Sequence, residues 1–243
     1  MRFNTIKITD SVSTNSELKK MALEGAEVGT VLVAERQSGG RGRLGRSFLS
    51  DEGGLYMSVI LPYKLGDDAG LLTTYAAVAV ARAIERVAPV SVGIKWVNDL
   101  YVGGKKLCGI LAEAVTRGDG IFAVLGIGVN LTNKLSRELS DIATTLFDEC
   151  GVAVSPDVLL EAIIDELSDF EKADFEKTIE EYRHRCVILG KNIDVIPHEG
   201  EKYAAKAVDI LSDGSLLVKR KADGEMIRVF SGEVSVRAWE DKA

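Results

Sequence analysis

Short apolar runs, several of them alternating with polar residues, mark β-strands along the first half of the chain. Gly103–Gly104 separates two of these runs and is a two-residue turn of the kind that closes a hairpin. The pattern predicts strands at Phe3–Ile8, Thr30–Glu35, Leu55–Leu61, Val92–Trp96, Asp99–Val102, Lys105–Val115 and Ile121–Val129.

Apolar residues at helical spacing predict three helical segments. Leu71–Val87 is apolar on nearly all sides, which is typical of a helix buried against a sheet. Pro156–Arg185 is predicted to be helical, with an apolar stripe for the core and an acidic face for solvent. Thr14 and Glu17 match the capping box, so Thr14 is expected to cap a short helix that follows it.

Beyond Gly190 the pattern changes to short alternating strands interrupted by two turns. The turns are Ser212–Asp213–Gly214 and Ala222–Asp223–Gly224, and they suit a small β-barrel of about 55 residues. We therefore predict an α+β fold with two domains. Residues 1–188 would form a mixed β-sheet with flanking helices, and residues 189–243 would form the barrel.

The composition is that of an ordinary globular protein with an acidic balance. Of 243 residues, 46% are hydrophobic and 28% are charged, which excludes disorder across most of the chain. Lysine and arginine total 30 against 37 for aspartate and glutamate, so a mainly electrostatic nucleic-acid binder is not expected. No apolar run reaches the ~18 residues of a membrane span, and the N-terminus lacks an apolar signal core. A cytoplasmic protein without membrane contact is therefore expected.

Cysteine and histidine are too scarce for several kinds of chemistry. The three cysteines are far apart and form no CxxC, which suits a reduced compartment and argues against a disulfide framework. The two histidines have no cysteine or second histidine at ligand spacing, so neither a zinc site nor a histidine-activated nucleophile has much support. Chemistry is expected to rest on arginine, lysine, aspartate, asparagine and backbone N–H groups.

A loop rich in glycine and arginine follows the second predicted strand. It contains a GxGxxG at Gly40, Gly42 and Gly45, but a dinucleotide-binding loop must open a helix, and Ser47–Gly54 has turn residues instead. The loop also carries arginines whose guanidinium groups suit phosphate or carboxylate oxygens. An anion site is favoured, and a solvated basic turn or an RNA-binding stretch stays open. The arginines are Arg41, Arg43 and Arg46.

The predicted hairpin carries a second group of polar residues. Asn98 and Asp99 lie between two strands, where the carboxylate suits Mg²⁺ and the same side chains suit a simple Asx turn. Lys105 and Lys106 are neighbours on a strand, so only one of them can face a given pocket. Gly109 thins that strand at a point where a ligand could lie.

Two further segments have both a structural and a functional interpretation. Ser13–Thr14–Asn15 at a helix start either caps the helix or holds a ligand carbonyl or carboxylate. Gly126, Gly128 and Asn130 end a strand, where small residues permit close packing or leave space beside a planar ligand.

Taken together and in this order, these motifs resemble those of biotin protein ligases, also called biotin–[carboxylase] ligases. The resemblance covers essentially the whole chain, and the GRGR loop followed by KWxNDLY and KLxGIL is its most specific part. It implies a class II synthetase-like mixed-sheet catalytic domain with a small SH3-like barrel behind it. The matching stretches are Ser13–Thr14–Asn15, Gln37 with Gly40–Arg46, Lys95–Gly109, Gly126–Asn130 and Gly232–Glu233–Val234–Ser235.

The resemblance implies an ATP-dependent reaction in two steps. Biotin carboxylate would attack the α-phosphate of ATP to give biotinyl-5′-AMP and pyrophosphate. A lysine of a biotin carboxyl carrier protein, or of such a domain in a biotin-dependent carboxylase, would then take the biotin and release AMP. Mg²⁺ would accompany ATP, and a homodimer is plausible from the family.

Site roles follow from the resemblance position by position. Biotin-site positions are matched by Ser13, Thr14, Asn15 and Gln37, and the loop that closes over biotin and the phosphates by Gly40, Arg41, Gly42 and Arg43. Lys106 matches the lysine near the biotin carboxylate and the α-phosphate. Further ligand-side positions are Asn98 and Asp99 for ATP and Mg²⁺, Gly109 and Gly128 on the strands, Asn130 on the adenine side and Arg237 from the barrel.

The chain departs from the family pattern in three places. Val97 stands where proline is usual, which would make the backbone leading to Asn98 less rigid. Phe48 stands where a tryptophan often follows the loop. Only 12 residues precede Ser13, too few for a helix-turn-helix, so no DNA-binding repressor activity is expected. Two rival functions stay open, a lipoate-protein ligase and a non-catalytic nucleotide- or RNA-binding module.

Overall fold

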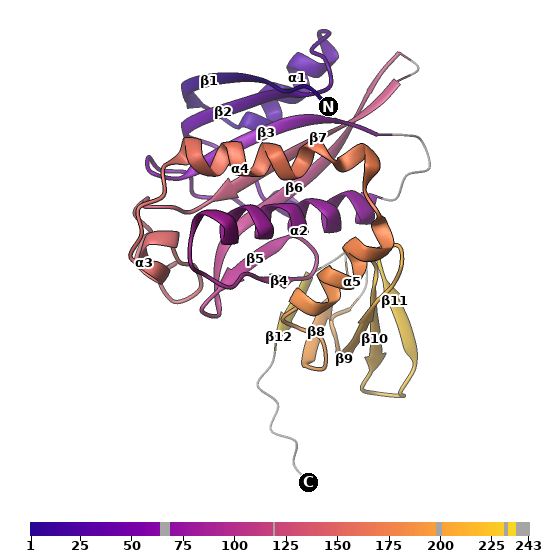
Figure 1. The fold of residues 1–243 in the computed structure, drawn as a ribbon. Coiled ribbons are helices and arrows are strands. Elements are labelled where there is room, and N and C mark those ends of the chain that lie inside the picture. Colours follow the sequence, from indigo (N-terminus) through magenta and orange to yellow (C-terminus); the bar gives the residue numbers. More distant parts are fainter. Residues whose placement is uncertain (64–68, 119, 198–200, 231–232, 237–243) are drawn as a thin grey trace.

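A seven-stranded mixed β-sheet forms the centre of the larger part of the protein (Figure 1). The computed structural model describes residues 1–63, 69–118, 120–197, 201–230 and 233–236. The strand order is β1-β2-β3-β7-β6-β5-β4, and β1 pairs in parallel with β2 while the other pairs are antiparallel. All seven predicted strands are present. They are β1 (Asn4–Ser11), β2 (Thr30–Gln37), β3 (Leu55–Pro62), β4 (Gly93–Lys95), β5 (Asp99–Val102), β6 (Lys105–Arg117) and β7 (Gly120–Val129).

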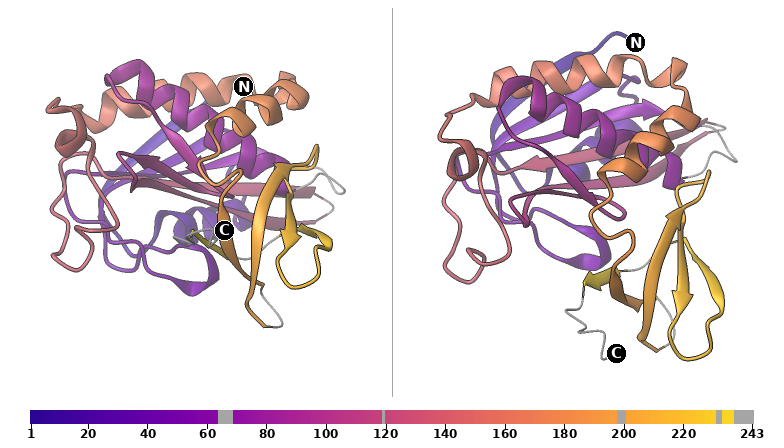
Figure 2. Two further views of the ribbon diagram at one scale, coloured as in Figure 1. Left: turned by 90° about the horizontal axis from the view of Figure 1, so that it is seen from below. Right: turned by 60° about the horizontal axis from the view of Figure 1, so that its bottom comes forward.

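Helices cover both faces of this sheet, as the edge-on view in Figure 2 shows. On one face, α2 (Ala69–Val87) packs against the sheet and against α4 (Pro156–Ser168) and α5 (Phe175–Arg185). Most apolar side chains of α2 are buried there, and Leu71 and Val87 near its two ends are partly buried, which agrees with the all-round hydrophobicity of its sequence. On the other face, α1 (Thr14–Leu23) buries Leu18 in a smaller cluster of apolar side chains. A short helix, α3 (Leu146–Cys150), lies beyond β7 in the chain.

The predicted helix over 156–185 is wrong in one respect, because the chain turns in its middle. Between α4 and α5 lies a 3₁₀ turn at Phe170–Lys172, and Asp174 caps α5 by accepting from the backbone N–H of Lys177 at 3.2 Å. Phe170 and Phe175 both pack edge-on against Tyr75 of α2, with ring centroids 5.1 and 6.3 Å away. A straight helix would not direct both rings at one tyrosine, so this tertiary contact ends α4.

The C-terminal part forms a second, five-stranded antiparallel sheet with the order β11-β10-β9-β8-β12. Its turns use Gly214 and Gly224 with φ of 80° and 76°, as the sequence predicts. Within the described residues, no helix is both long and apolar enough to cross a membrane. The domain boundary at residue 188 stays a prediction. The strands are β8 (Asn192–Ile196), β9 (Tyr203–Ile210), β10 (Leu216–Arg220), β11 (Met226–Val229) and β12 (Glu233–Val236).

The segment that joins β4 to β5 is held from outside the seven-stranded sheet. The indole N–H of Trp96 donates to the carbonyl of Gly214 in the second sheet at 3.0 Å, and the Tyr182 hydroxyl of α5 donates to the carbonyl of Val97 at 3.0 Å. Trp96 and Val97 are buried, and the peptide bond between them is cis. The looser backbone expected from valine in place of proline is therefore offset by two buried hydrogen bonds.

Replacing Tyr182 with phenylalanine is expected to destabilise the protein by about 1–3 kcal/mol, because the buried carbonyl of Val97 loses its donor. The change keeps the ring and removes only the hydroxyl. Urea unfolding followed by circular dichroism measures the difference. The matched control is Tyr101→Phe on β5. Because the Tyr101 side chain is partly exposed, we expect the free energy of unfolding to change by no more than about 0.5 kcal/mol. An equal loss of unfolding free energy in the two variants would contradict a stabilising role for the hydrogen bond from Tyr182 to Val97.

Candidate active site

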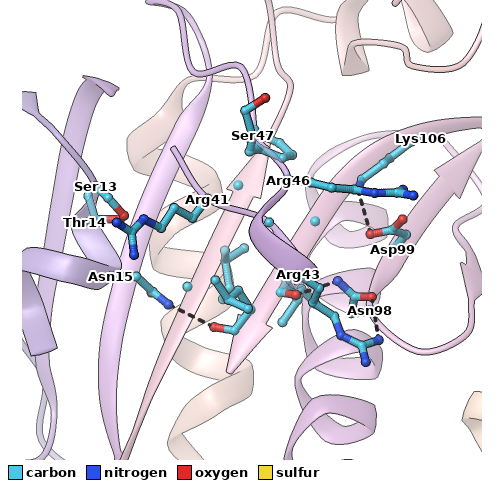
Figure 3. Close-up of a pocket in the computed structure, with 18 of the residues that line it drawn as sticks. Ser13, Thr14, Asn15, Arg41, Arg43, Arg46, Ser47, Asn98, Asp99 and Lys106 are labelled. Atoms are coloured by element: carbon cyan, nitrogen blue, oxygen red, sulfur yellow. Dashed lines mark hydrogen bonds and ion pairs between the residues drawn. The ribbon is translucent and has the colours of Figure 1, made fainter. Parts of the chain in front are cut away.

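A pocket lies on the α1 face of the sheet, beyond the N-terminus of that helix (Figure 3). The start of α1 forms one end, the β5–β6 hairpin forms the other, and the loop after β2 crosses between them. The pocket brings together most of the positions singled out in the sequence. Those that line it are Ser13, Thr14, Asn15, Gln37, Arg41, Gly42, Arg43, Asn98, Asp99, Lys106, Gly109 and Gly128.

The first turn of α1 corrects the predicted cap. Ser13, not Thr14, is the N-cap, and its side chain accepts from the backbone N–H of Ser16 at 3.5 Å. Thr14 is the first helical residue, and its N–H and hydroxyl both point to Gln37 Oε1, at 2.8 and 3.1 Å. The cap moved by one residue because Gln37 on β2 provides Thr14 with a partner that the local sequence does not reveal. The shift places the Thr14 hydroxyl in the pocket.

Gln37 connects α1 to the loop that crosses the pocket. Its Nε2 donates to Ser50 Oγ at 2.8 Å, and Ser50 Oγ donates to the carbonyl of Phe48 at 3.0 Å. The oxygen of the Gln37 amide therefore faces Thr14 and the nitrogen faces Ser50. Gly40 is part of this loop but not of the pocket lining, and a Cβ there would come within 2.4 Å of the Phe48 carbonyl oxygen. Only glycine fits the loop at that position.

Asn15 is held by three neighbours from the sheet. Its Nδ2 donates to the carbonyl of Leu111 at 3.3 Å and to Glu113 Oε2 at 3.0 Å, and its Oδ1 accepts from Ser58 Oγ at 2.7 Å. A Cβ on Gly126 would lie 2.2 Å from Asn15 Oδ1, so glycine leaves the room that Asn15 occupies. Sequence reasoning missed Ser58 and Glu113, because within a strand nothing marks a polar side chain as a partner of a distant helix.

The Gly/Arg loop forms a narrow turn and no α-helix. The N–H of Gly42 donates to the carbonyl of Arg46 at 2.7 Å, and a 3₁₀ turn at Arg43–Gly45 is followed by extended backbone. The reason given for rejecting a dinucleotide-binding loop is therefore confirmed. Arg43 Nη1 donates to Asn98 Oδ1 at 3.4 Å, which links the loop to the hairpin (Figure 3).

The hairpin end of the pocket is cationic. Lys106 Nζ lies 2.7 Å from Asp99 Oδ1, whereas Lys105 Nζ donates to the carbonyl of Ser140. The prediction that only one of the two lysines faces the pocket is confirmed. Asp99 is the single carboxylate among the described residues that line the pocket, against five cations, so the pocket favours an anionic ligand. Four of the cations are Arg43, Arg46, Lys95 and Lys106, and the fifth, Arg41, points toward the start of α1 (Figure 3).

The floor between the two ends is formed by a pair of glycines beneath an aromatic ring. Gly109 of β6 and Gly128 of β7 are register partners in the sheet. A Cβ on Gly128 would lie 2.7 Å from the ring of Phe48, and one on Gly109 would lie 3.2 Å from it. The Lys106 ammonium lies 5.9 Å from the centre of the same ring. Phe48 thus provides the apolar cover for which the family often uses tryptophan.

The predicted adenine-side residue has other partners, and two further predicted positions lie outside the described residues. Asn130 is buried outside the pocket lining, where its Nδ2 donates to the carbonyl of Thr144 at 3.2 Å and its Oδ1 accepts from Asn133 at the same distance. These bonds hold the chain after β7, and the adenine-side contact of Asn130 stays a prediction. Arg237 lies outside the described residues, as does Gly232 of the C-terminal motif.

The donor set does not form a metal site of its own. No group of three or more histidine, cysteine, aspartate or glutamate side chains in the described part of the chain could hold a metal ion. Mg²⁺ commonly binds one or two carboxylates plus substrate phosphates. Asp99 with Asn98 fits that second arrangement. Covalent catalysis by a thiol is not supported for Cys108, since burial raises the pKa of its thiol.

The chain is similar to proteins of one family. The family model described as the Biotin/lipoate A/B protein ligase family matches residues 6–130. A biotin–[acetyl-CoA-carboxylase] ligase of Mycobacterium tuberculosis is 32% identical over 93% of this chain and 86% of the relative. The bifunctional ligase/repressor BirA of Bacillus subtilis is 41% identical over 57% of this chain, and this match spans 45% of that protein.

Solved structures with the same architecture contain ligands. A biotin protein ligase from Aquifex aeolicus in complex with biotin and ATP has a TM-score of 0.83 and 30% identity, covering 96% of this chain and 98% of that one. A biotin protein ligase from Leishmania major in complex with biotinyl-5-AMP has a TM-score of 0.68 and 25% identity, covering 93% of this chain and 98% of the other. The similarity therefore extends over both sheets.

Proposed function

The chain belongs to the biotin/lipoate A/B protein ligase family, and on that premise we propose that it is an ATP-dependent biotin protein ligase. The carboxylate of biotin attacks the α-phosphorus of ATP, and pyrophosphate leaves. The ε-amine of a carrier lysine then attacks the acyl carbon of biotinyl-5′-AMP and loses a proton, and AMP leaves.

One observation carries this proposal, namely a single pocket with two chemically different ends. At the α1 end, amide and hydroxyl groups with fixed partners suit a neutral ligand group that both donates and accepts hydrogen bonds, such as the ureido ring of biotin. At the hairpin end, arginines and lysines suit phosphates. The two ends lie on one continuous surface beneath one loop, as a carboxylate that must meet an α-phosphate requires.

The cationic end supplies the catalysis that this reaction needs. Negative charge increases at the α-phosphorus as the carboxylate oxygen bonds to it. Arg43 and Lys106 at this end, together with Arg41 of the loop that crosses the pocket, stabilise that charge more than they stabilise the ground state, which lowers the barrier. No protein nucleophile takes part. Mg²⁺ would arrive with ATP, held by Asp99 and Asn98 together with phosphate oxygens, and would neutralise phosphate charge.

The acceptor is proposed to be a biotin carboxyl carrier protein or the equivalent domain of a carboxylase. The name of the Mycobacterium tuberculosis relative supports this choice. The test mixes the protein with biotin, labelled ATP and such a carrier domain, and follows pyrophosphate, AMP and biotinylated lysine. Formation of all three supports the proposal. Transfer of lipoate without transfer of biotin, in a parallel reaction, would replace it by a lipoate ligase, and no pyrophosphate with either acid would leave a non-catalytic binding protein.

Arg43→Gly is expected to let biotinyl-5′-AMP leave the pocket at least about tenfold faster, because the loop loses its link to Asn98 and a charge-assisted contact to phosphate. The adenylate is formed in place with labelled ATP and its release is followed by rapid filtration. The control is Arg36→Gly, since Arg36 lies on β2 near the loop but pairs with Asp10 at the surface. Release at the parental rate from the Arg43 variant would contradict a closing role for the loop.

A further inference from the structure

We propose that Glu113 is a positioning residue for the biotin end of the pocket, acting through the side chain amide of Asn15. The inference rests on the proposed function and adds to it a residue that does not line the pocket. Glu113 lies on β6, four positions after Gly109, and Asn15 lies in the first turn of α1. Their contact joins the helix to the sheet at the polar end of the site.

The carboxylate of Glu113 is shared between a charged partner and a neutral one. Oε1 lies 2.8 Å from the ammonium of Lys19, one turn further along α1, and Oε2 accepts from Asn15 Nδ2 at 3.0 Å. Burial alone would raise the pKa of Glu113, but hydrogen bonds from Lys19 and Asn15 outweigh it and hold that pKa below its usual value. Glu113 is therefore ionised at neutral pH and can only accept hydrogen bonds.

An ionised Glu113 determines which way the Asn15 amide points. An asparagine amide can be turned by 180°, which exchanges its oxygen and its nitrogen. In the observed orientation Nδ2 faces two acceptors, Glu113 and the carbonyl of Leu111, and Oδ1 faces the hydroxyl of Ser58. After a turn the oxygen would face both acceptors, so the reversed orientation is disfavoured.

The orientation of the Asn15 amide also affects the hydrogen bonds that Ser58 makes beside the pocket. Ser58 Oγ lies 2.7 Å from Asn15 Oδ1 and 2.8 Å from Thr14 Oγ1. A hydroxyl carries one proton, and the Thr14 hydroxyl directs its own to Gln37 Oε1 at 3.1 Å, so the Ser58 proton is shared between two acceptors, Asn15 Oδ1 and Thr14 Oγ1. By holding Asn15 Oδ1 toward Ser58, Glu113 thus keeps an acceptor next to the hydroxyl that also contacts Thr14, and Asn15 and Thr14 both line the pocket. Correctly directed groups matter for a ligand that must match donors to acceptors, and a misdirected buried polar group weakens binding.

The alternative is that Glu113 only forms an ion pair with Lys19. Both side chains are about one-third exposed, at 30% and 35%, and pairs of that kind contribute little to stability. The two interpretations differ in what removal of Lys19 does. Lys19→Met breaks the ion pair and leaves the contact between Glu113 and Asn15, whereas Glu113→Gln introduces an amide that can donate as well as accept.

Biotin affinity, measured by calorimetry on the full chain, is the test. Glu113→Gln is expected to weaken biotin binding about tenfold and to leave the KM for ATP within about twofold of the parent, while Lys19→Met stays within about twofold for both. In an Asn15→Ala background the effect of Glu113→Gln is expected to disappear, since the residue through which it acts is absent. Thermal melting of each variant reports whether it is folded.

Three results would overturn the proposal. They are parental biotin affinity in Glu113→Gln, an undiminished effect of Glu113→Gln in the Asn15→Ala background, or an equal loss in Lys19→Met. Failure of the proposed function gives a different result, in which the parent protein itself neither binds biotin nor releases pyrophosphate with it.

Discussion

Lys106→Ala is expected to slow formation of biotinyl-5′-AMP by about 10²–10³-fold, the usual cost of removing one group that stabilises transition-state charge. Lys106 lies in the cationic end of the pocket, and its ammonium is held 2.7 Å from Asp99. Its loss removes a positive charge near the reacting phosphate and leaves Asp99 with an unbalanced negative charge. Single-turnover reactions with biotin and labelled ATP, quenched and separated, measure the adenylation rate directly.

The adjacent lysine provides the control for that experiment. Lys105 has the same charge one residue earlier on β6, but its ammonium donates to the carbonyl of Ser140 outside the pocket. Lys105→Ala is therefore expected to leave the adenylation rate within about twofold of the parent, as a surface change normally does. An unchanged rate in Lys106→Ala, or an equal loss in both variants, would show that charge near the hairpin does not act on the reaction.

Gly126→Ala is expected to weaken biotin binding by about 10–100-fold, corresponding to the loss of one or two hydrogen bonds. The added Cβ would lie 2.2 Å from Asn15 Oδ1 and 2.8 Å from its Cγ. Asn15 must move, and because the sheet holds its amide at both ends, movement breaks contacts with Ser58 or Leu111. Calorimetric titration with biotin measures the loss.

A second glycine of the same strand provides the matched control. Gly120 begins β7, at the opposite end of the strand from the pocket. A Cβ there would approach the Phe122 ring at 3.2 Å and come no closer than 3.5 Å to any other residue that is not its neighbour in the chain. Gly120→Ala is expected to bind biotin with nearly parental affinity. Should both alanine variants bind biotin equally well, the space beside Asn15 would not be needed for the ligand.

The succession of elements could be predicted because it depends on local patterns. Each strand of the larger sheet was marked by its apolar run, and the hairpin was marked by Gly103–Gly104, whose φ values of 59° and 84° suit glycine. The alternation of a strand was enough to separate Lys105 from Lys106. Charge density likewise identified the loop that crosses the pocket. These features need no knowledge of any distant residue.

The predictions that were wrong concern positions whose structure depends on residues far away in the chain. The cap of α1 shifted from Thr14 to Ser13 because Thr14 has a partner 23 residues away on β2. The helix predicted over 156–185 ends early because Phe170 and Phe175 pack on Tyr75. In each case the local sequence allowed two outcomes, and a contact formed on folding selected one.

The sequence by itself determined the kinds of elements, the cationic loop and the fact that only one of Lys105 and Lys106 can face the pocket, since periodicity and charge are properties of neighbouring residues. Only the tertiary structure decided the direction of the polar network at the α1 end. Asn15 and Glu113 are 98 positions apart in the chain, and Asn15 and Ser58 are 43 apart. The orientation of an amide depends on which donors and acceptors surround it in space, and the folded chain alone brings those atoms together.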